Sequence, residues 1–116
     1  MIVWIGVALL GGAGACARFL LDGAIASGAF PNGTLAVNLS GAFLLGLLAG
    51  ADVTGDAYLL AGTAALGAYT TFSTWMFESQ RAAEEGRSRA AILNLVLSAA
   101  LGLATAALGR AIGGAL

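Results

Sequence analysis

The sequence lacks several residue types on which most enzyme and metal sites depend. Histidine is absent, which removes the commonest general base, pH switch and metal ligand in proteins. Cys16 is the only cysteine, so neither an intrachain disulfide nor a site with several thiolate ligands can form. A hydrolytic triad and a zinc centre therefore lack parts, and we do not expect an enzyme.

Charge is equally scarce. Charged residues make up 9% of the 116 residues, against about 25% in an ordinary soluble domain. Lysine is absent, and the net charge of −1 leaves no basic surface that would bind nucleic acid. Hydrophobic residues make up 59% of the chain. Because a small soluble domain must cover a large surface with polar groups, this composition indicates an integral membrane protein in contact with lipid.

Four apolar stretches are long enough to cross a bilayer, which takes about 20 residues of helix. They predict an all-α bundle of four transmembrane helices, a single domain over residues 1–116. Short polar turns separate the stretches, and turns this short make consecutive helices antiparallel neighbours. The predicted helices cover about residues 2–28, 33–51, 57–83 and 90–112.

The orientation in the membrane is weakly indicated. The third turn carries Arg81, Arg87 and Arg89, whereas the first two turns carry no arginine. The positive-inside rule then places the first and third turns in the cytoplasm and both termini outside. A difference of a few arginines is small, so insertion in both orientations stays open.

Polar residues occur within the apolar stretches, where each needs a reason. Arg18 and Asp22 are four apart on one helical face and can pair. They form either a helix end at the interface or an interior anchor and anion-attracting vestibule. Asn38 on the second stretch, and Asn94 and Ser98 on the fourth, either bond to neighbouring helices or provide donors along a narrow path.

The strongest local signal is the stretch GAYTTFSTW at residues 67–75, in the middle of the third predicted helix. Hydroxyl side chains compete for backbone hydrogen bonds and lower helix propensity, although a straight helix with back-bonded hydroxyls is an alternative. A broken helix is tolerated at membrane depth only where protein or a cavity satisfies the freed groups. Such breaks expose carbonyls and helix N-termini that can hold ions.

Three motifs, in order, resemble those of the Fluc (CrcB) family of fluoride channels. They are GGAGACARF at 11–19, GTLAVNLSG at 33–41, and TTFST at 70–74 preceded by Gly67. The resemblance covers essentially the whole chain. It implies an antiparallel, dual-topology dimer, either a homodimer or a pair with a related subunit, with two pores along the interface. It also implies passive export of fluoride across the plasma (inner) membrane of a prokaryote.

The resemblance also assigns roles to individual residues. It implies a broken third helix and a structural Na⁺ held by the backbone carbonyls of Gly67 and Thr70. The vestibule or structural positions are Arg18 and Glu78. The residues that match the fluoride pore are Thr34, Asn38, Phe72, Ser73, Thr74, Trp75 and Ser98. Trp75 departs from the family pattern, because it replaces the second pore phenylalanine.

The chemistry of these residues suits a fluoride path. Fluoride is small and tightly hydrated, so a pore must replace its water with donors such as the Asn38 amide and nearby hydroxyls. The positive edge of the Phe72 ring can also meet an anion. No lysine or arginine lies among the central residues, and weaker dipoles let the ion leave again.

Two other classes of small membrane protein share this length and hydropathy. A small multidrug-resistance-type proton-coupled exporter needs a membrane-embedded glutamate in its first helix, where this chain offers only Asp22 after Arg18. Binding of lipophilic cations would identify that class. A holin-like lesion protein would not need the three motifs, and lysis on overexpression would reveal it.

Overall fold

The computed structural model describes residues 1–25 and 31–116, and across these two ranges it contains helices and no strand. The all-α prediction is therefore confirmed. The three long helices are α1 (Ile2–Ile25), α2 (Asn32–Gly50) and α6 (Ser88–Gly114). In the described ranges these three are long and apolar enough to cross a membrane. The first predicted helix extends to residue 28, and its last three residues lie outside the described ones.

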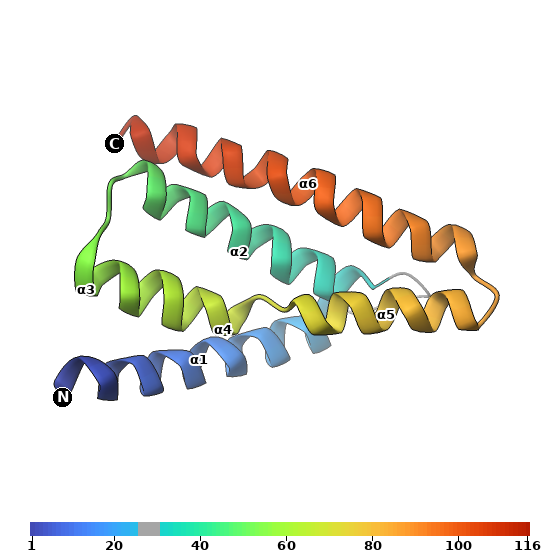
Figure 1. Ribbon diagram of the computed structural model, residues 1–116, viewed down its shortest axis with the longest axis horizontal. Coiled ribbons are helices and arrows are strands. Elements are labelled where there is room, and N and C mark those ends of the chain that lie inside the picture. Colours follow the sequence, from blue (N-terminus) through green and yellow to red (C-terminus); the bar gives the residue numbers. More distant parts are fainter. Residues whose placement is uncertain (26–30) are drawn as a thin grey trace.

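The third apolar stretch is divided into four consecutive elements. They are α3 (Gly55–Tyr58), the π-helix η1 (Leu59–Leu66), α4 (Gly67–Tyr69) and α5 (Phe72–Glu84). Figure 1 shows them following one another along the bundle, with α2 and α6 on one side and α1 on the other. The N- and C-termini lie at the same end. Because of this division, no one of the four elements is long enough to span a bilayer.

Helices α2 and α6 form the most extensive contact of the fold. Their backbones touch at glycines four residues apart, Gly46 and Gly50 on α2 and Gly109 and Gly113 on α6. A Cβ atom on Gly46 would overlap the Ala106 carbonyl, and a Cβ on any of the other three would likewise overlap a carbonyl of the facing helix. Small residues at this spacing let membrane helices approach closely. The third stretch packs on both sides of the bundle: η1 and α4 lie mainly against α1, and α5 lies mainly against α6.

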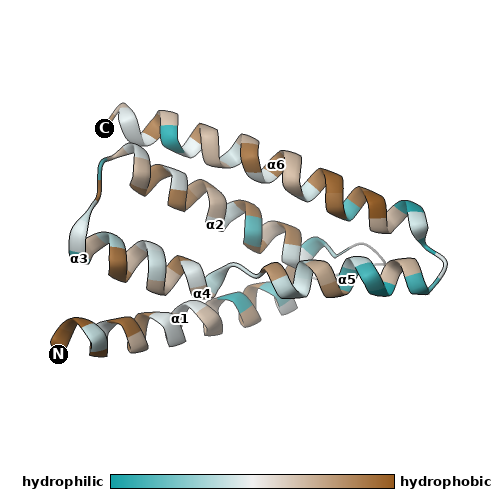
Figure 2. Cartoon of the chain, in the orientation of Figure 1, coloured by the Kyte–Doolittle hydropathy of each residue, from teal (hydrophilic) through white to brown (hydrophobic). Residues whose placement is uncertain are grey.

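Large apolar side chains cover the outside of the bundle. Trp4, Leu9 and Phe19 on α1, and Leu103 on α6, are all more than half exposed. Figure 2 shows hydrophilic residues gathered in the second half of α1, in the first half of α2 and along α5. An apolar exterior of this kind requires lipid around it, which identifies a membrane protein.

The charged end of the bundle lies at the turn between α5 and α6. Gly86, with φ +78°, adopts the left-handed conformation that ends α5. The N–H of Arg87 donates to the Ala82 carbonyl at 2.8 Å and that of Gly86 to Ala83 at 3.2 Å, which is a Schellman motif. Arg87 also bonds Glu85 and lowers the pKa of its carboxyl.

Candidate functional site

The helical path of the third stretch is interrupted at two threonines. Thr70 (φ −80°, ψ 161°) and Thr71 (φ −147°, ψ 118°) are both extended, between the end of α4 and the start of α5. Thr71 caps α5, because its Oγ1 accepts the Thr74 N–H at 3.2 Å and donates to Thr74 Oγ1 at 3.0 Å. Helix α5 therefore begins in the middle of the bundle, and its N-terminus places a partial positive charge there.

Asn38 of α2 clamps the backbone of the interruption. Its Nδ2 donates to the Thr71 carbonyl at 2.9 Å, and its Oδ1 accepts the Thr71 N–H at 2.8 Å. In an unbroken α-helix that N–H would bond the Gly67 carbonyl, four residues earlier. The clamp therefore satisfies both polar groups of Thr71 and leaves the Gly67 carbonyl without its usual helical donor.

A second contact from α2 supports the residues before the interruption. The Ser40 hydroxyl donates to the Val37 carbonyl at 3.0 Å and lies 2.8 Å from the Tyr69 hydroxyl, from which it accepts. A Cβ on Gly41 would overlap Cγ2 of Thr70. Glycine at position 41 thus lets α2 approach the interruption closely enough for Asn38 to reach Thr71.

An open groove of about 730 Å³ runs along the interruption. Its polar lining comes from α2, the interruption and α6, together with Tyr58 of α3 and Thr63 of η1, and most of the rest is aliphatic. Six of the residues predicted for the site line this groove: Asn38, Gly67, Thr70, Phe72, Trp75 and Ser98. The fold therefore brings together residues from three separate parts of the sequence.

Two aromatic rings stand at the groove. Phe72 and Trp75 form an edge-to-face pair with centroids 5.6 Å apart and an interplanar angle of 87°. Phe72 is 68% exposed. The Trp75 indole N–H donates to the Asn94 carbonyl at 3.0 Å. The extra donor that tryptophan brings is therefore already occupied by α6.

Asn94 joins α5 to α6 beside the groove. Its side chain is 1% exposed, and its Nδ2 donates to Ser79 Oγ at 2.7 Å. Its Oδ1 accepts from the Ser98 hydroxyl at 3.2 Å. Because an unpaired buried amide is costly, this network favours one position of α5 on α6.

The Trp75 hydrogen bond leads to a prediction about stability. Trp75→Phe should lower the free energy of unfolding by about 1 kcal/mol, since it removes one part-buried hydrogen bond. Thermal unfolding in detergent measures the change. Trp4→Phe is the matched control, because Trp4 is 66% exposed, and it should unfold at the wild-type temperature. Equal unfolding temperatures for both variants would show that the bond to Asn94 contributes nothing.

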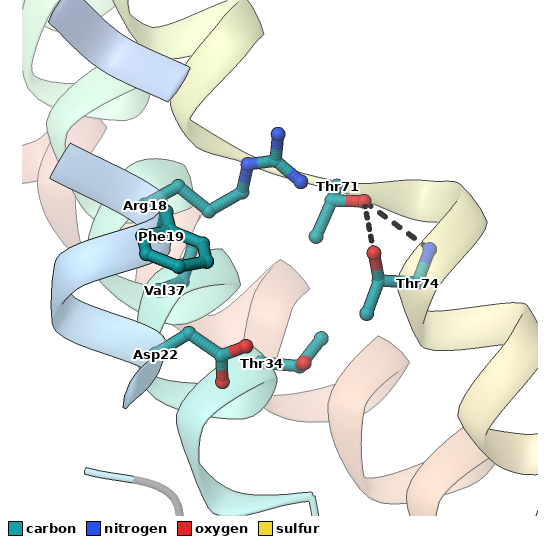
Figure 3. A pocket seen from close by; sticks show the side chains of 7 residues that line it. All are labelled: Arg18, Phe19, Asp22, Thr34, Val37, Thr71 and Thr74. Atoms are coloured by element: carbon teal, nitrogen blue, oxygen red, sulfur yellow. Dashed lines mark hydrogen bonds between the residues drawn. The ribbon is translucent and has the colours of Figure 1, made fainter. Parts of the chain in front are cut away.

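A smaller cavity of about 240 Å³ lies on the other side of the Thr71 backbone. Figure 3 shows its lining residues Arg18, Phe19, Asp22, Thr34, Val37, Thr71 and Thr74. Thr71 lines both the cavity and the groove. The two spaces therefore meet at Thr71, and the polar residues on the cavity side are three threonines, one arginine and one aspartate.

Several polar atoms around this cavity are buried without a hydrogen-bond partner among the described residues. They are Arg18 Nε, Thr34 Oγ1 and Glu78 Oε1. Thr34 is 2% exposed, and the Glu78 carboxyl lies near both the Thr34 hydroxyl and the Asp22 carboxylate. Within the described ranges Arg18 and Asp22 form no ion pair, although their spacing allows one. Buried polar groups in this state need water or an ion.

The remaining predicted residues lie beside these two spaces. Ser73 is exposed in the first turn of α5, 3.5 Å from the Thr71 hydroxyl, and Glu78 lies two turns into α5. Neither Thr71 nor Asn94 is among the predicted pore residues, although Asn94 was expected either to bond a neighbouring helix or to provide a donor, and it bonds Ser79 of α5. A hydroxyl three residues before Thr74 is a recognisable N-cap pattern, and Asn94 one turn before Ser98 was a second available signal.

Comparison with known proteins identifies a family that this chain matches. Residues 5–110 match the family model described as CrcB-like protein, Camphor Resistance (CrcB). The match includes every predicted site residue.

Curated relatives cover nearly the full length of the chain. A protein of Mycolicibacterium paratuberculosis named Fluoride-specific ion channel FluC 2 is 59% identical over 93% of this chain and 91% of its own. A protein of the same name from Mycobacterium bovis is 54% identical over 93% of this chain and 88% of its own. Fluoride-specific ion channel FluC 1 of Symbiobacterium thermophilum is 45% identical, over 95% of this chain and 96% of its own.

Proposed function

Because this chain belongs to the CrcB-like family, we propose that it is a subunit of a fluoride-selective passive channel that lets fluoride leave the cytoplasm. The names of its relatives support this proposal. A channel of this kind relieves fluoride toxicity, since fluoride enters as the neutral acid and leaves as the anion under a negative-inside potential. The plasma (inner) membrane of a prokaryote is the proposed location.

The observation that carries the proposal is the groove at the interruption. A dehydrated fluoride ion needs several donors at short range, without a fixed positive charge that would trap it. The Phe72 ring edge and the Asn38 amide, which keeps a second N–H, lie along the groove beside the N-terminal end of α5. The Ser98 hydroxyl also lines the groove, and it would donate to fluoride by turning away from Asn94. Thr34 and Thr74 line the cavity on the other side of Thr71, and Ser73, exposed in the first turn of α5, would extend this hydroxyl track. In this proposal Arg18 and Glu78 belong to the vestibule.

A second subunit is part of the proposal. The open groove on the single chain carries a 68% exposed phenylalanine and, within a mostly apolar lining, the polar groups of Asn38 and the interruption, which lipid could not satisfy. A partner in the opposite orientation, either the same chain or a related one, would cover the groove. The elements from Gly55 to Glu84 then act together as one broken third transmembrane segment. The small arginine bias of the turns is compatible with insertion in both orientations.

A structural Na⁺ at the interruption is also proposed. The Gly67 carbonyl has lost its helical donor to the Asn38 clamp, and Thr70 lies where the backbone leaves the helix. Carbonyl oxygens are ligands that hard cations accept, so this donor set fits Na⁺. The carbonyls of Gly67 and Thr70 from the two subunits would hold the ion. When bound, the ion raises the local potential for anions beside it.

The test of passive transport uses purified protein in liposomes that contain fluoride and potassium, with equal pH on both sides. We expect fluoride to leave when valinomycin imposes a potential, and the rate to follow that potential. A fluoride electrode measures the efflux, and protein-free liposomes give the background. Efflux that required a proton gradient would contradict a passive channel and favour a coupled exporter.

A further inference from the structure

A π-helix precedes the interruption, separated from it only by the three residues of α4. Element η1 covers eight residues, Leu59–Leu66, and the next residue is Gly67. π-Helices are rare, occur mostly as single turns and are frequent at functional sites. Each π hydrogen bond spans one residue more than an α bond. One residue corresponds to a rotation of about 100° around the helix axis, so the winding of η1 determines the direction of the carbonyls that follow.

Helix α1 contacts η1 backbone to backbone at Gly14. Gly14 is the one buried residue that α1 contains. A Cβ on Gly14 would overlap the Ala65 carbonyl oxygen, and the Ala65 carbonyl carbon and Cα would lie 3.1 and 3.3 Å from that Cβ. Helix backbone atoms cannot rotate aside as a side chain can. A larger residue at position 14 must therefore displace the last turn of η1.

The other glycines of α1 do not share this constraint. A Cβ on Gly11 would lie 3.8 Å from the Ala64 oxygen, which is an ordinary contact, and a Cβ on Gly12 would meet nothing within 4 Å. A Cβ on Gly6 would meet only the end of the Leu60 side chain, which can move. The constraint on η1 is therefore concentrated at Gly14, whose contact Ala65 lies two residues before Gly67.

We propose that Gly14 is a positioning residue for the ion path. By admitting the Ala65 backbone, it keeps η1 in its π-helical winding and so determines where the Gly67 and Thr70 carbonyls point at the interruption. This inference rests on the proposed channel function. It adds that α1 determines the position of the carbonyl site from outside the groove, since Gly11, Gly12 and Gly14 of α1 do not line it.

Gly14→Ala is the test, with Gly12→Ala as the matched control. We expect Gly14→Ala to reduce fluoride efflux per folded protein by about tenfold, because overpacking forces a backbone shift. The Na⁺ concentration that half-saturates efflux should rise, since the carbonyls no longer converge. Gly12→Ala should match the wild type in its efflux rate and in its half-saturating Na⁺ concentration. Wild-type efflux and Na⁺ dependence in Gly14→Ala would overturn the proposal, and so would an equal loss of efflux in Gly12→Ala. Efflux that does not depend on Na⁺ in the wild type or in either variant would also overturn it.

Hydrogen exchange separates this inference from the proposed function. In detergent, Gly14→Ala should speed amide exchange across residues 59–71, and Gly12→Ala should not. Unchanged exchange in Gly14→Ala would overturn the positioning role, even if the wild-type protein passes fluoride. If the wild type passes none, the proposed function fails and exchange alone decides the role of Gly14.

A milder variant covers the case in which Gly14→Ala does not fold. Gly11→Val places its branched carbons toward the Ala64 carbonyl, where a Cβ alone would only touch it. We expect a smaller change of the same kind in both efflux and exchange over residues 59–71. If Gly14→Ala does not fold and Gly11→Val has wild-type efflux and exchange, the contact between α1 and η1 is needed only for folding. That result would overturn the proposal.

Discussion

Fluoride efflux through an Asn38→Asp channel should fall by at least about tenfold, because the change breaks a hydrogen bond and places a carboxylate against both a carbonyl and a permeating anion. In the wild type the Asn38 Nδ2 donates to the Thr71 carbonyl at 2.9 Å while Oδ1 accepts the Thr71 N–H. Aspartate keeps the acceptor and loses the donor. Its second oxygen would face the Thr71 carbonyl and repel fluoride in the groove.

The measurement is voltage-driven fluoride efflux from liposomes with equal amounts of folded protein. Asn32→Asp is the matched control, because it makes the same chemical change at an exposed position in the first turn of α2. An acidic residue is favourable at a helix N-terminus, so the control should fold and conduct like the wild type. If Asn38→Asp conducts as fast as Asn32→Asp, the clamp is not part of the fluoride path.

The second large effect concerns the contact between α2 and α6. Gly109→Ala should destabilise the subunit by about 1–3 kcal/mol, since overpacking at a backbone contact forces the two helices apart. A Cβ on Gly109 would overlap the Phe43 carbonyl oxygen and lie 3.1 Å from the Leu47 nitrogen. The sign is informative, because Gly→Ala within a free helix is normally favourable by about 1 kcal/mol.

Gly114→Ala is the control for this contact. Its Cβ would lie 3.8 Å from the Gly50 oxygen, so the added methyl group fits without movement. Thermal unfolding in detergent, followed by size-exclusion chromatography, should show a lower unfolding temperature for Gly109→Ala and an unchanged or higher one for Gly114→Ala. Unfolding of Gly109→Ala at or above the wild-type temperature would mean that the helices are not in backbone contact there.

The hydropathy of the sequence is enough to predict the three long helices, because lipid imposes a simple rule of length and composition, but it does not reveal that the third predicted helix is divided. It predicts their ends less well. Helix α6 continues to Gly114, past the expected end near residue 112, since the glycines Gly109 and Gly113 pack on α2 and keep the chain helical. Such an extension depends on the partner helix, which a run of apolar residues does not reveal.

The local chemistry around Thr70 and Thr71 indicates where a helix is weak, but not what holds it open. The partner of Thr71 is Asn38, 33 residues earlier, and the acceptor of the Trp75 indole is Asn94, 19 residues later. Long-range pairs of this kind follow from packing. The π winding of Leu59–Leu66 is harder still, because nothing in that aliphatic segment distinguishes it from an α-helix and its register depends on Gly14.

The central claim is that donors along the interrupted segment replace the water of fluoride and not that of larger anions. The most direct test is to load the same liposomes with fluoride and chloride and to record both ions with electrodes while one potential is applied. The account predicts that fluoride leaves at a protein-dependent rate while chloride release stays at the protein-free background. Chloride release at a rate comparable to that of fluoride would contradict it.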